Sequence, residues 1–268
     1  MNTTNKTKVV AIIMAGGLGT RMNSTVPKVL HKLLGKPMIM HIIYNLLDLG
    51  RYYHLQNIFI VVGKYKEQIK AEIEKYITIP SITYIDQPAA LGTGHAIQCC
   101  SFSLLKYTDT KTIILSGDVP MFSLKSMRAL LNDVNKARIV VTDFENPHGY
   151  GRIILRNGGC GEFEKIIEHN DCTYDELLVQ KVNCGIYAFD TNVLLKWLPH
   201  LQNNNSKKEY YLTDIVELIK SGENVEIELC EIHHNNQYEI MGVNTPEQLK
   251  HLEELFEYKK IDLFHKCS

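Results

Sequence analysis

The sequence predicts an α/β fold in which helices cover both faces of a parallel sheet. Short apolar runs, such as VVAIIM at 9–14 and NIFIVVG at 57–63, are typical of strands that are buried on both sides. Segments with helical spacing separate these runs, and such alternation favours parallel strands joined by crossover helices. From about residue 145 the chain is rich in glycine and turn residues with short β segments, which indicates an inserted β-rich lobe.

The composition agrees with a globular protein that has a sizeable core. The chain has 268 residues, 45% of them apolar, which suits one large domain or two small ones. Lysine and arginine (29) nearly balance aspartate and glutamate (30), so no general nucleic-acid or membrane-surface binder is expected. No apolar stretch reaches the ~18 residues of a membrane span, and the polar start MNTTNKTK does not resemble a signal peptide.

The seven cysteines indicate neither a disulfide framework nor a zinc site. Their number is odd, Cys99 and Cys100 are adjacent, and no C-x-x-C pair occurs. We therefore expect reduced and mostly buried thiols in a cytoplasmic protein.

The first half of the chain follows the alternation closely. The segment 37–50 is predicted to be a helix with Pro37 at its first position and Gly50 just past its end. The next helix is expected at 66–77, where apolar residues recur at helical spacing. Further strands are expected at 82–86, 111–118 and 138–144, and further helices at 94–105 and 123–134.

The second half returns to the same kind of pattern after the lobe. Strands are expected at 180–189 and 224–232, with a helix between them at 212–222 that Gly222 closes. A last amphipathic helix begins after Thr245, the expected N-cap, with Gln248 completing a capping box.

The segment MAGGLGTRM (14–22) forms a glycine-rich turn directly after the first strand. Glycines leave backbone N–H groups exposed, so a phosphate can approach them closely. Arg21 adds a planar fork and Lys28 a compact charge, a pair that suits a triphosphate. Met22 stands where the Rossmann fingerprint has its third glycine, and the Walker pattern is absent. A tight turn with solvated cations is the alternative, and we favour phosphate binding.

A second polar turn, SGD at 116–118, also follows an apolar strand. Ligands of parallel sheets bind outside the carboxyl ends of the strands, so the two turns are expected to face one crevice. Asp118 at such an end suits Mg²⁺, a hard cation that takes one or two protein oxygens. The alternative is an N-cap of the following helix, which spacing alone would favour.

Several segments resemble a known enzyme family. MAGGLGTRM…VPKVLHKLLGKPMIMHI is similar to the signature of the sugar-1-phosphate nucleotidyltransferases. QPAALGTGHA, SGDVPM, HGYGRI, IIEHND, VNCGIY, NNNSKKEYYLTDIV and MGVN follow in order and resemble the uridyltransferase domain of bacterial bifunctional N-acetylglucosamine-1-phosphate uridyltransferases. The resemblance implies a Rossmann-like sheet flanked by helices, with a β-rich sugar-binding lobe. It also implies that UTP and N-acetylglucosamine 1-phosphate react, with Mg²⁺, to UDP-N-acetylglucosamine and pyrophosphate.

On this resemblance the chain 1–268 is expected to form a single nucleotidyltransferase domain. Residues 1–144 would be the nucleotide-binding portion, 145–244 the sugar-binding lobe and the return to the core, and 245–268 the C-terminal helix. The sequence has no hexapeptide repeats, so we expect no acetyltransferase activity. The oligomeric state is left open, because the β-helix half drives trimerisation in the family.

The resemblance also implies the nucleotide-binding residues. Gln87 would lie on the uracil, where an amide offers one donor and one acceptor face. By itself, LGTG at 91–94 would be only a turn that opens a helix, and His95 in that helix is expected to be structural. The implied nucleotide-binding set is Met14, Ala15, Gly16, Gly17, Gln87, Gly92 and Thr93.

The lobe is implied to bind the sugar, and two residues are implied to bind the metal. The implied sugar-binding set is Gly117, Gly151, Glu168 and Asn183, and the implied Mg²⁺ ligands are Asp118 and Asn244. Glu168 could otherwise be a surface salt-bridge partner, and Asn244 a turn residue. Cys184 stands where the family has threonine, so one hydroxyl is lost at the sugar.

The expected mechanism needs no side-chain nucleophile. A sugar phosphate with a second pKa of about 6 is largely a dianion near neutral pH and can attack the α-phosphorus of UTP in line. Catalysis would rest on positioning and charge: Arg21 holds the departing pyrophosphate, and Lys28 the oxygens around the α-phosphorus. Asp118 and Asn244 would hold the Mg²⁺ that bridges the phosphates.

Two alternatives remain at this point. One is the same chemistry with another sugar 1-phosphate or another nucleotide, such as a thymidine or guanosine triphosphate. The other is a non-catalytic sugar-nucleotide sensor, because a fold does not fix a function. The joint presence of both cations and both metal ligands speaks against the sensor.

Overall fold

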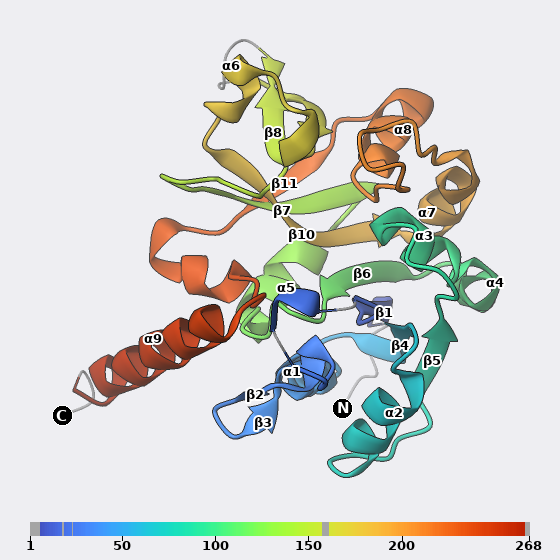
Figure 1. Ribbon diagram of the computed structural model, residues 1–268. Helices are drawn as coiled ribbons and strands as arrows, with labels where there is room; N and C mark the ends of the chain where they lie inside the picture. The colour runs from blue at the N-terminus through green and yellow to red at the C-terminus, as the bar shows by residue number, and fades with distance from the viewer. Residues whose placement is uncertain (1–5, 18, 23, 157–160, 266–268) are drawn as a thin grey trace.

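A large mixed sheet forms the centre of the molecule (Figure 1). The computed structural model describes residues 6–17, 19–22, 24–156 and 161–265. In this part of the chain the sheet has nine strands in the order β11-β7-β10-β6-β1-β4-β5, with β8 and β9 as a hairpin on β10. The strands are β1 (Lys8–Met14), β4 (His54–Val62), β5 (Ile82–Asp86), β6 (Lys111–Ser116), β7 (Ala137–Asp143), β8 (Arg152–Leu155), β9 (Phe163–Ile167), β10 (Lys181–Asp190) and β11 (Glu228–Glu231). A separate two-stranded ladder joins β2 (Lys32–Leu33) and β3 (Lys36–Pro37).

Helices lie on both faces of this sheet, as the sequence predicts. The α-helices are α1 (Met38–Leu49), α2 (Lys66–Glu74), α3 (Thr93–Gln98), α4 (Ser101–Leu104), α5 (Leu124–Leu131), α6 (Tyr174–Leu177), α7 (Thr191–Trp197), α8 (Asp214–Glu223) and α9 (Pro246–His265). Single 3₁₀ turns are η1 (Thr20–Met22), η2 (Lys28–Leu30), η3 (Leu105–Tyr107), η5 (His169–Asp171) and η6 (Leu198–His200), and η7 (His234–Ile240) is longer.

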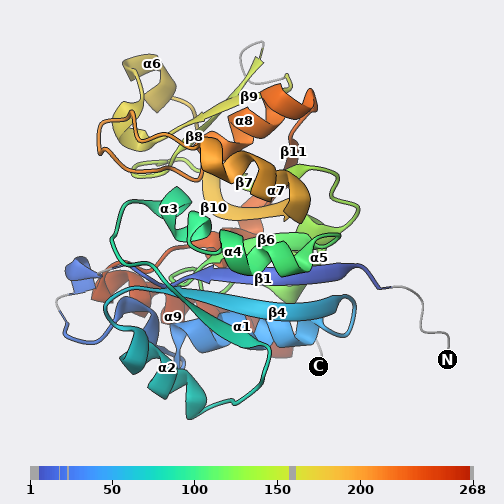
Figure 2. The same cartoon turned by 90° about the vertical axis from the view of Figure 1, so that its right-hand side faces the viewer.

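The alternation of side chains along β1 divides the core into two layers. Val9, Ala11 and Ile13 pack with apolar residues of α1, α2 and α5 on one face. Val10 and Ile12 pack with α3, α4, α7 and α8 on the other face. Successive residues of a strand point to opposite faces. Because helices cover both faces, all five side chains are fully buried. The α/β fold class with helices on both faces is therefore confirmed (Figure 2).

Strand β10 departs from the predicted parallel arrangement. β1, β4, β5 and β6 pair in parallel, and β7 pairs in parallel with β11. β10 lies between β6 and β7 and runs antiparallel to both. Between β7 and β10 the chain forms the β8–β9 hairpin, and β8 pairs with β10. The lobe and the core therefore share one continuous sheet. The start of β10 consequently lies at the edge where β6 ends.

Two local predictions are wrong by small amounts. The segment 94–105 is not one helix, since it breaks at Cys99 and Cys100 into α3 and α4. Pro37 is not the first helical residue, because it pairs with Lys32 in the β2–β3 ladder and α1 begins one residue later. Gly50 does lie just past the end of α1, as expected.

Gly222 does not end its helix, contrary to the prediction. α8 continues to Glu223, and Asn224 follows in the left-handed conformation with φ 50°. A Cβ at Gly222 would lie 1.9 Å from Cζ2 of Trp197. The glycine therefore serves close helix packing, and asparagine, which tolerates the left-handed region, provides the C-cap.

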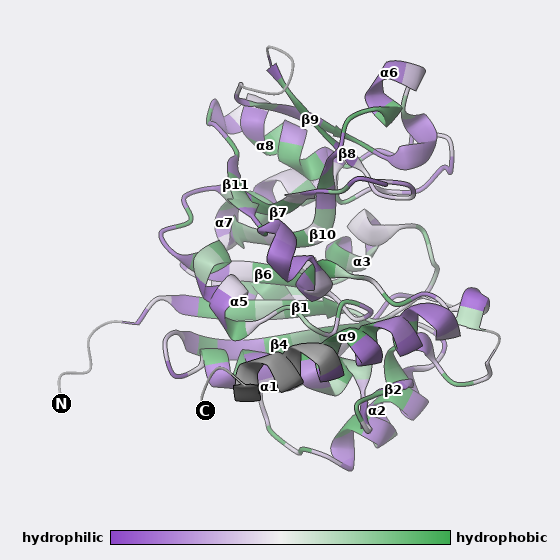
Figure 3. Ribbon diagram, turned by 90° about the vertical axis from the view of Figure 1, so that its left-hand side faces the viewer, coloured by the Kyte–Doolittle hydropathy of each residue, from purple (hydrophilic) through white to green (hydrophobic). Residues whose placement is uncertain are grey.

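Helix α9 lies apart from the other helices and ends the described chain (Figure 1). Leu252 anchors it, buried with Leu33, Met38 and Val243. Figure 3 shows the apolar residues concentrated in the central strands. Over the described residues, every helix is too short or too polar to cross a membrane. The cysteines of this part of the chain are free thiols.

Candidate active site

The predicted nucleotide-binding residues lie at or after the carboxyl ends of parallel strands, at one edge of the sheet. β1 ends at Met14 and Ala15 to Gly17 follow it, and Gly117 N–H, just after β6, donates to Met14 O at 2.9 Å. Gln87 follows β5, and its backbone N–H donates to Val62 O at 2.8 Å. The two turns that the sequence places at strand ends thus lie beside each other, as parallel pairing requires.

Two adjoining cavities open at this edge. The larger, about 460 Å³, is lined by Arg21, Tyr150, Gly151, Glu168, Asn183 and Asn244, among others. The smaller, about 230 Å³, is lined by Ala15, Gly16, Gly17, Lys28, Gln87 and Gly92, among others. Met14, Thr93, Ser116 and Asp118 line both. The predicted phosphate-binding and metal-binding groups lie where the cavities meet, which suits a two-substrate reaction.

Five polar side chains, contributed by the glycine-rich turn and the segment after it, the end of β6 and the loop before α9, converge at this junction. Lys28 donates to Asp118 Oδ2, and its Nζ lies 3.0 Å from Asn244 Oδ1. Arg21 donates to the same Oδ1 at 3.1 Å. Ser116 Oγ donates to the other carboxylate oxygen of Asp118 at 2.6 Å. The carboxylate is thereby fixed by one donor on each oxygen. Asp118 does not act as a helix N-cap, because Ser123 caps α5.

The loop that carries Asn244 is tied both to β6 and to α9. Val243 N–H donates to Asp118 O at 2.8 Å, and Asn244 N–H donates to Gln248 Oε1 at 2.7 Å. Gln248 N–H donates to Thr245 Oγ1 at 3.3 Å. The predicted capping box therefore forms with one change, since the Gln248 side chain bonds the residue before the N-cap.

The donor set at Asp118 and Asn244 fits a magnesium ion. One ammonium group, that of Lys28, already contacts an oxygen of each residue, so the two oxygens face a common point that accepts a cation. Carboxylate and amide oxygens are the donors that Mg²⁺ takes, usually together with water and substrate phosphates. The described residues contain no cluster of three or more His, Cys, Asp or Glu side chains that could hold a metal.

The turn that opens α3 lines the smaller cavity with Gly92 and Thr93. Gly92 has φ 108°, and a Cβ there would lie 2.5 Å from Tyr210 O, so only glycine fits this turn. Thr93 Oγ1 accepts from Leu212 N–H at 3.1 Å. These contacts hold the segment 210–212 against the LGTG turn, so that Glu209 lines the smaller cavity and Leu212 the larger.

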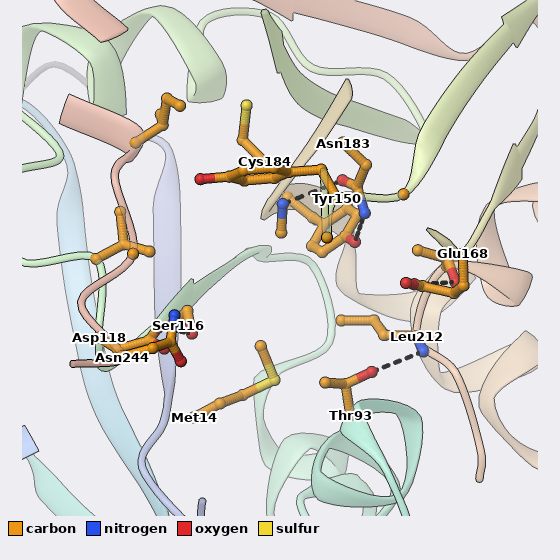
Figure 4. Close-up of a pocket in the computed structure, with 18 of the residues that line it drawn as sticks. Met14, Thr93, Ser116, Asp118, Tyr150, Glu168, Asn183, Cys184, Leu212 and Asn244 are labelled. Carbon is orange, nitrogen blue, oxygen red and sulfur yellow. Dashed lines mark hydrogen bonds between the residues drawn. The ribbon is translucent and has the colours of Figure 1, made fainter. Parts of the chain in front are cut away.

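Glu168 lies on the far side of the larger cavity, opposite Asp118 and Asn244 (Figure 4). Thr213 Oγ1 donates to Glu168 Oε1 at 3.1 Å. Burial raises the pKa of the Glu168 carboxyl, while the Thr213 hydrogen bond acts in the opposite direction. Glu168 thus bonds a buried hydroxyl in the cavity wall, and the alternative role as a surface salt-bridge partner is not supported.

Asn183 lies at the start of β10 with both ends of its amide partly used. Its Nδ2 donates to Tyr187 OH at 2.7 Å, and its Oδ1 accepts from Gly185 N–H at 3.1 Å. Its backbone N–H donates to Gly151 O at 2.9 Å, which ties β10 to the lobe. One N–H and one lone pair of the amide remain for a ligand. The neighbouring Cys184 is buried, and burial raises the pKa of its thiol.

One predicted contact residue is not part of the cavity walls, and other residues of the walls were not predicted. Gly117 does not line either of these cavities, and a Cβ there would lie 2.8 Å from Cγ1 of Val29, so packing explains this glycine. The predictions omitted Ser116, Tyr150 and Thr213, which line the larger cavity. Ser116 and Tyr150 are adjacent to the predicted Gly117 and Gly151, whereas Thr213 lies within the motif NNNSKKEYYLTDIV, in which no site residue is predicted.

The fold and this site are those of an enzyme that joins a nucleotide to a second phosphate-bearing substrate. The chain belongs to the nucleotidyl transferase family, whose pattern matches residues 10–257. A probable UDP-N-acetylglucosamine pyrophosphorylase from Acanthamoeba polyphaga mimivirus is 39% identical over 92% of this chain and 95% of its own. The bifunctional protein GlmU of Clostridium tetani is 36% identical over 95% of this chain, which spans about half the length of GlmU.

Solved structures share the fold at low sequence identity. A UDP-glucose pyrophosphorylase complexed with UDP-glucose is 17% identical with a TM-score of 0.70, over 93% of this chain and 98% of that one. A putative glucose-1-phosphate thymidylyltransferase from Bacillus anthracis is 20% identical with a TM-score of 0.67, over 92% and 94%. The recognition of a nucleotidyltransferase from the sequence motifs is confirmed, and the protein is an enzyme of this family.

Proposed function

We propose that the protein transfers the uridylyl group of UTP to N-acetylglucosamine 1-phosphate, which yields UDP-N-acetylglucosamine and pyrophosphate. The name of the mimivirus relative supports this choice, since that protein aligns over nearly its whole length. The observation that carries the proposal is the convergence of Arg21, Lys28, Asp118 and Asn244 where the two cavities meet.

The proposed reaction places one substrate in each cavity. UTP lies over the glycine turn with its base near Gln87, and the sugar lies between Glu168 and Asn183. A phosphate oxygen of the sugar attacks the α-phosphorus of UTP, and the bond from that phosphorus to the oxygen bridging to the β-phosphorus breaks. The electron pair leaves with pyrophosphate, so no proton needs to be removed from the dianionic attacking group.

The side chains at the junction would hold the phosphates rather than react. Lys28 would neutralise the charge that builds on the oxygens of the α-phosphorus, and Arg21, which is exposed, would bind the departing pyrophosphate as a fork. Asp118 and Asn244 would hold Mg²⁺, which supplies positive charge to the phosphates of both substrates. Binding of that ion requires the Lys28 ammonium to give up its present place between the two oxygens.

Pyrophosphate release with UTP, Mg²⁺ and a panel of sugar 1-phosphates tests the proposal. We expect release with N-acetylglucosamine 1-phosphate well above that with glucose 1-phosphate, and a product with the mass of UDP-N-acetylglucosamine. Asp118→Ala should abolish the signal, while Asp109→Ala, at an exposed aspartate that lines neither cavity, should keep it. An absence of release with every pair of substrates would contradict the proposal.

Another sugar 1-phosphate, such as glucose 1-phosphate, is the second candidate. Cys184 lines the larger cavity where the family resemblance places a threonine, so the wall lacks one hydroxyl there. The same panel separates the two, because preference for glucose 1-phosphate would keep the chemistry and discard the acetamido sugar. Replacing UTP by dTTP, CTP or GTP in the panel tests the nucleotide in the same way.

A further inference from the structure

The side chain of Gln87, which lines the smaller cavity, is oriented by two acceptors. Its Nε2 lies 3.1 Å from Gly92 O and 3.3 Å from His95 Nδ1. A carbonyl oxygen can only accept, so the NH₂ end of the amide must face Gly92. The second hydrogen of that NH₂ group points to His95, whose Nδ1 therefore accepts.

This arrangement favours one tautomer of the neutral His95 ring. Because Nδ1 accepts, the neutral ring carries its proton on Nε2. Nε2 faces Cys99 Sγ at 3.9 Å, and the ring lies tilted against Tyr210 with centroids 6.3 Å apart. His95 is half-buried and is held on several sides. A residue expected to be merely structural thus makes a directed contact with the predicted base-binding amide.

Oε1 of the Gln87 amide is the atom of this side chain that can accept a hydrogen bond from a ligand. Both N–H bonds of the side chain are used inside the protein, whereas Oε1 lies on the side of the glycine turn. A Cβ at Gly16 would lie 2.7 Å from Oε1, so the oxygen approaches the backbone of this turn closely. Gly16, Gly17, Ala90 and Ala96 line the same cavity and leave room for a flat ring.

We propose that His95 is a positioning residue that sets base specificity by holding Gln87 with its oxygen toward the nucleotide. An oxygen acceptor selects a base that presents an N–H, such as N3–H of uracil or thymine. It repels cytosine, whose N3 carries a lone pair. A site built to accept from one group discriminates strongly against an analogue that lacks the donor. The inference rests on the proposed function and names the feature that selects its nucleotide.

Gly92 O holds the amide by a single hydrogen bond, and the other hydrogen of the NH₂ group points at the His95 ring. Without an acceptor there, one hydrogen bond instead of two opposes rotation of the amide. The rotated amide would present its NH₂ to the base, which suits N3 of cytosine as well as O4 of uracil. Removing Nδ1 is therefore expected to weaken the choice between bases more than it weakens binding in general.

The test compares kcat/KM for UTP and CTP, at a fixed sugar 1-phosphate, in the purified wild type and in variants of His95. We expect the UTP-to-CTP ratio to fall at least 10-fold in His95→Leu and His95→Ala, mainly through the KM of UTP, with kcat changed little. His95→Asn offers Oδ1 near the place of Nδ1 and should retain most of the ratio. Cys99→Ala leaves Nδ1 in place and should retain it fully.

A binding measurement separates failure of this inference from failure of the proposed function. Calorimetric titration with UTP and with CTP reports base preference whether or not turnover occurs. Absence of turnover in the wild type would overturn the proposed function, whereas an unchanged UTP-to-CTP ratio in both His95→Leu and His95→Ala would overturn this inference. A wild type that binds CTP as tightly as UTP would also overturn it.

Discussion

At the residue scale, the site is organised around shared oxygen atoms. Asn244 Oδ1 accepts from both Arg21 and Lys28, and the Asp118 carboxylate is bonded by Lys28 and Ser116. Positive and negative groups thus compensate one another before any phosphate binds. Incoming phosphates can compete for the cations, and the freed oxygens can then accept a metal ion. In the proposed reaction the two cations would stabilise the charge that develops on the phosphates.

Lys28→Ala is expected to lower kcat by ~10²–10³, the usual effect of removing one charge-stabilising contact. The fold should persist, because Asp118 keeps its bond from Ser116. Steady-state pyrophosphate release measures the change, and Lys106→Ala, at an exposed lysine, is the matched control. Activity of Lys28→Ala within a few-fold of the wild type would show that this ammonium does not act on the reacting phosphate.

At the element scale, α8 shows how packing overrides a local signal. Its glycine lies inside the helix against an indole ring, and the helix ends at an asparagine in the left-handed conformation. The indole is itself held, since Trp197 Nε1 donates to Glu223 Oε1 at 2.9 Å. Thr213, directly before the first residue of the same helix, donates to Glu168 Oε1 at 3.1 Å. One helix therefore both supports the core and positions Glu168.

Gly222→Ala tests the packing at this helix. Helix propensity alone would stabilise the alanine variant by up to ~1 kcal/mol. The added methyl would instead overlap Trp197, and such overpacking costs about 1–3 kcal/mol. We expect a lower Tm in thermal unfolding, while Ser221→Ala, at the exposed neighbouring position, should leave it nearly unchanged. A Tm equal to or above that of the wild type would contradict the packing argument.

Asp214→Asn is expected to stabilise the protein at neutral pH. Burial, together with the negative charges of Glu217, Glu168 and Asp171, raises the pKa of Asp214 from 3.8 to about 6. A raised pKa means that this residue favours folding fully below pH 3.8 and loses that contribution as the pH rises through about 6. Asp214 is only half-buried and solvent screens its charge, so the gain at pH 7 should be about 1 kcal/mol.

Urea unfolding at several pH values checks this prediction. The difference between Asp214→Asn and the wild type should be largest at pH 7 and should vanish below about pH 4. Asp175→Asn serves as the control, because Asp175 also lies in the first turn of a helix, α6, but is exposed. A gain that does not depend on pH would rule out titration of Asp214 as its cause.

At the scale of the whole molecule, the site depends on contacts between segments far apart in the chain. Gln248 on α9 bonds the backbone of Asn244, Val243 bonds the backbone of Asp118, and Glu253 Oε1 accepts from Leu34 N–H at 2.9 Å. The last helix is therefore linked both to the candidate metal ligands and to the hairpin before α1. Removing the hydrogen bond from α9 to the loop that carries Asn244 should therefore change the binding properties of the site.

Gln248→Ala should raise the half-saturating Mg²⁺ concentration several-fold, since one hydrogen bond that orients Asn244 contributes about 0.5–1.5 kcal/mol. The KM for UTP at saturating Mg²⁺ should change little. Gln248→Glu keeps an acceptor and should behave like the wild type, as should Lys250→Ala on the exposed side of α9. Mn²⁺ binding followed by electron paramagnetic resonance gives a second readout, and equal affinity in Gln248→Ala would refute the link.

The sequence could predict elements and motif residues because both depend on local information. Apolar runs and helical periodicity identified seven strands of the central sheet and most helices, and the family motifs contain the candidate residues from Arg21 to Asn244. Gly117 and Gly222 show the limit of this reasoning, because their neighbours Val29 and Trp197 are distant in sequence. His95 shows the same limit at the site, since its directed contact with Gln87 appears only when β5 and α3 are in place.

By itself the sequence determined the fold class, the family and the residues that form the glycine turn and the polar strand ends. Only the tertiary structure decided that β10 runs antiparallel between β6 and β7 and so brings Asn183 to the edge where Asp118 lies. It also decided that α9 holds Asn244 beside Asp118. The physical reason is that periodicity and propensity act over a few residues, whereas strand order and side-chain convergence depend on burial and hydrogen bonding across the whole chain.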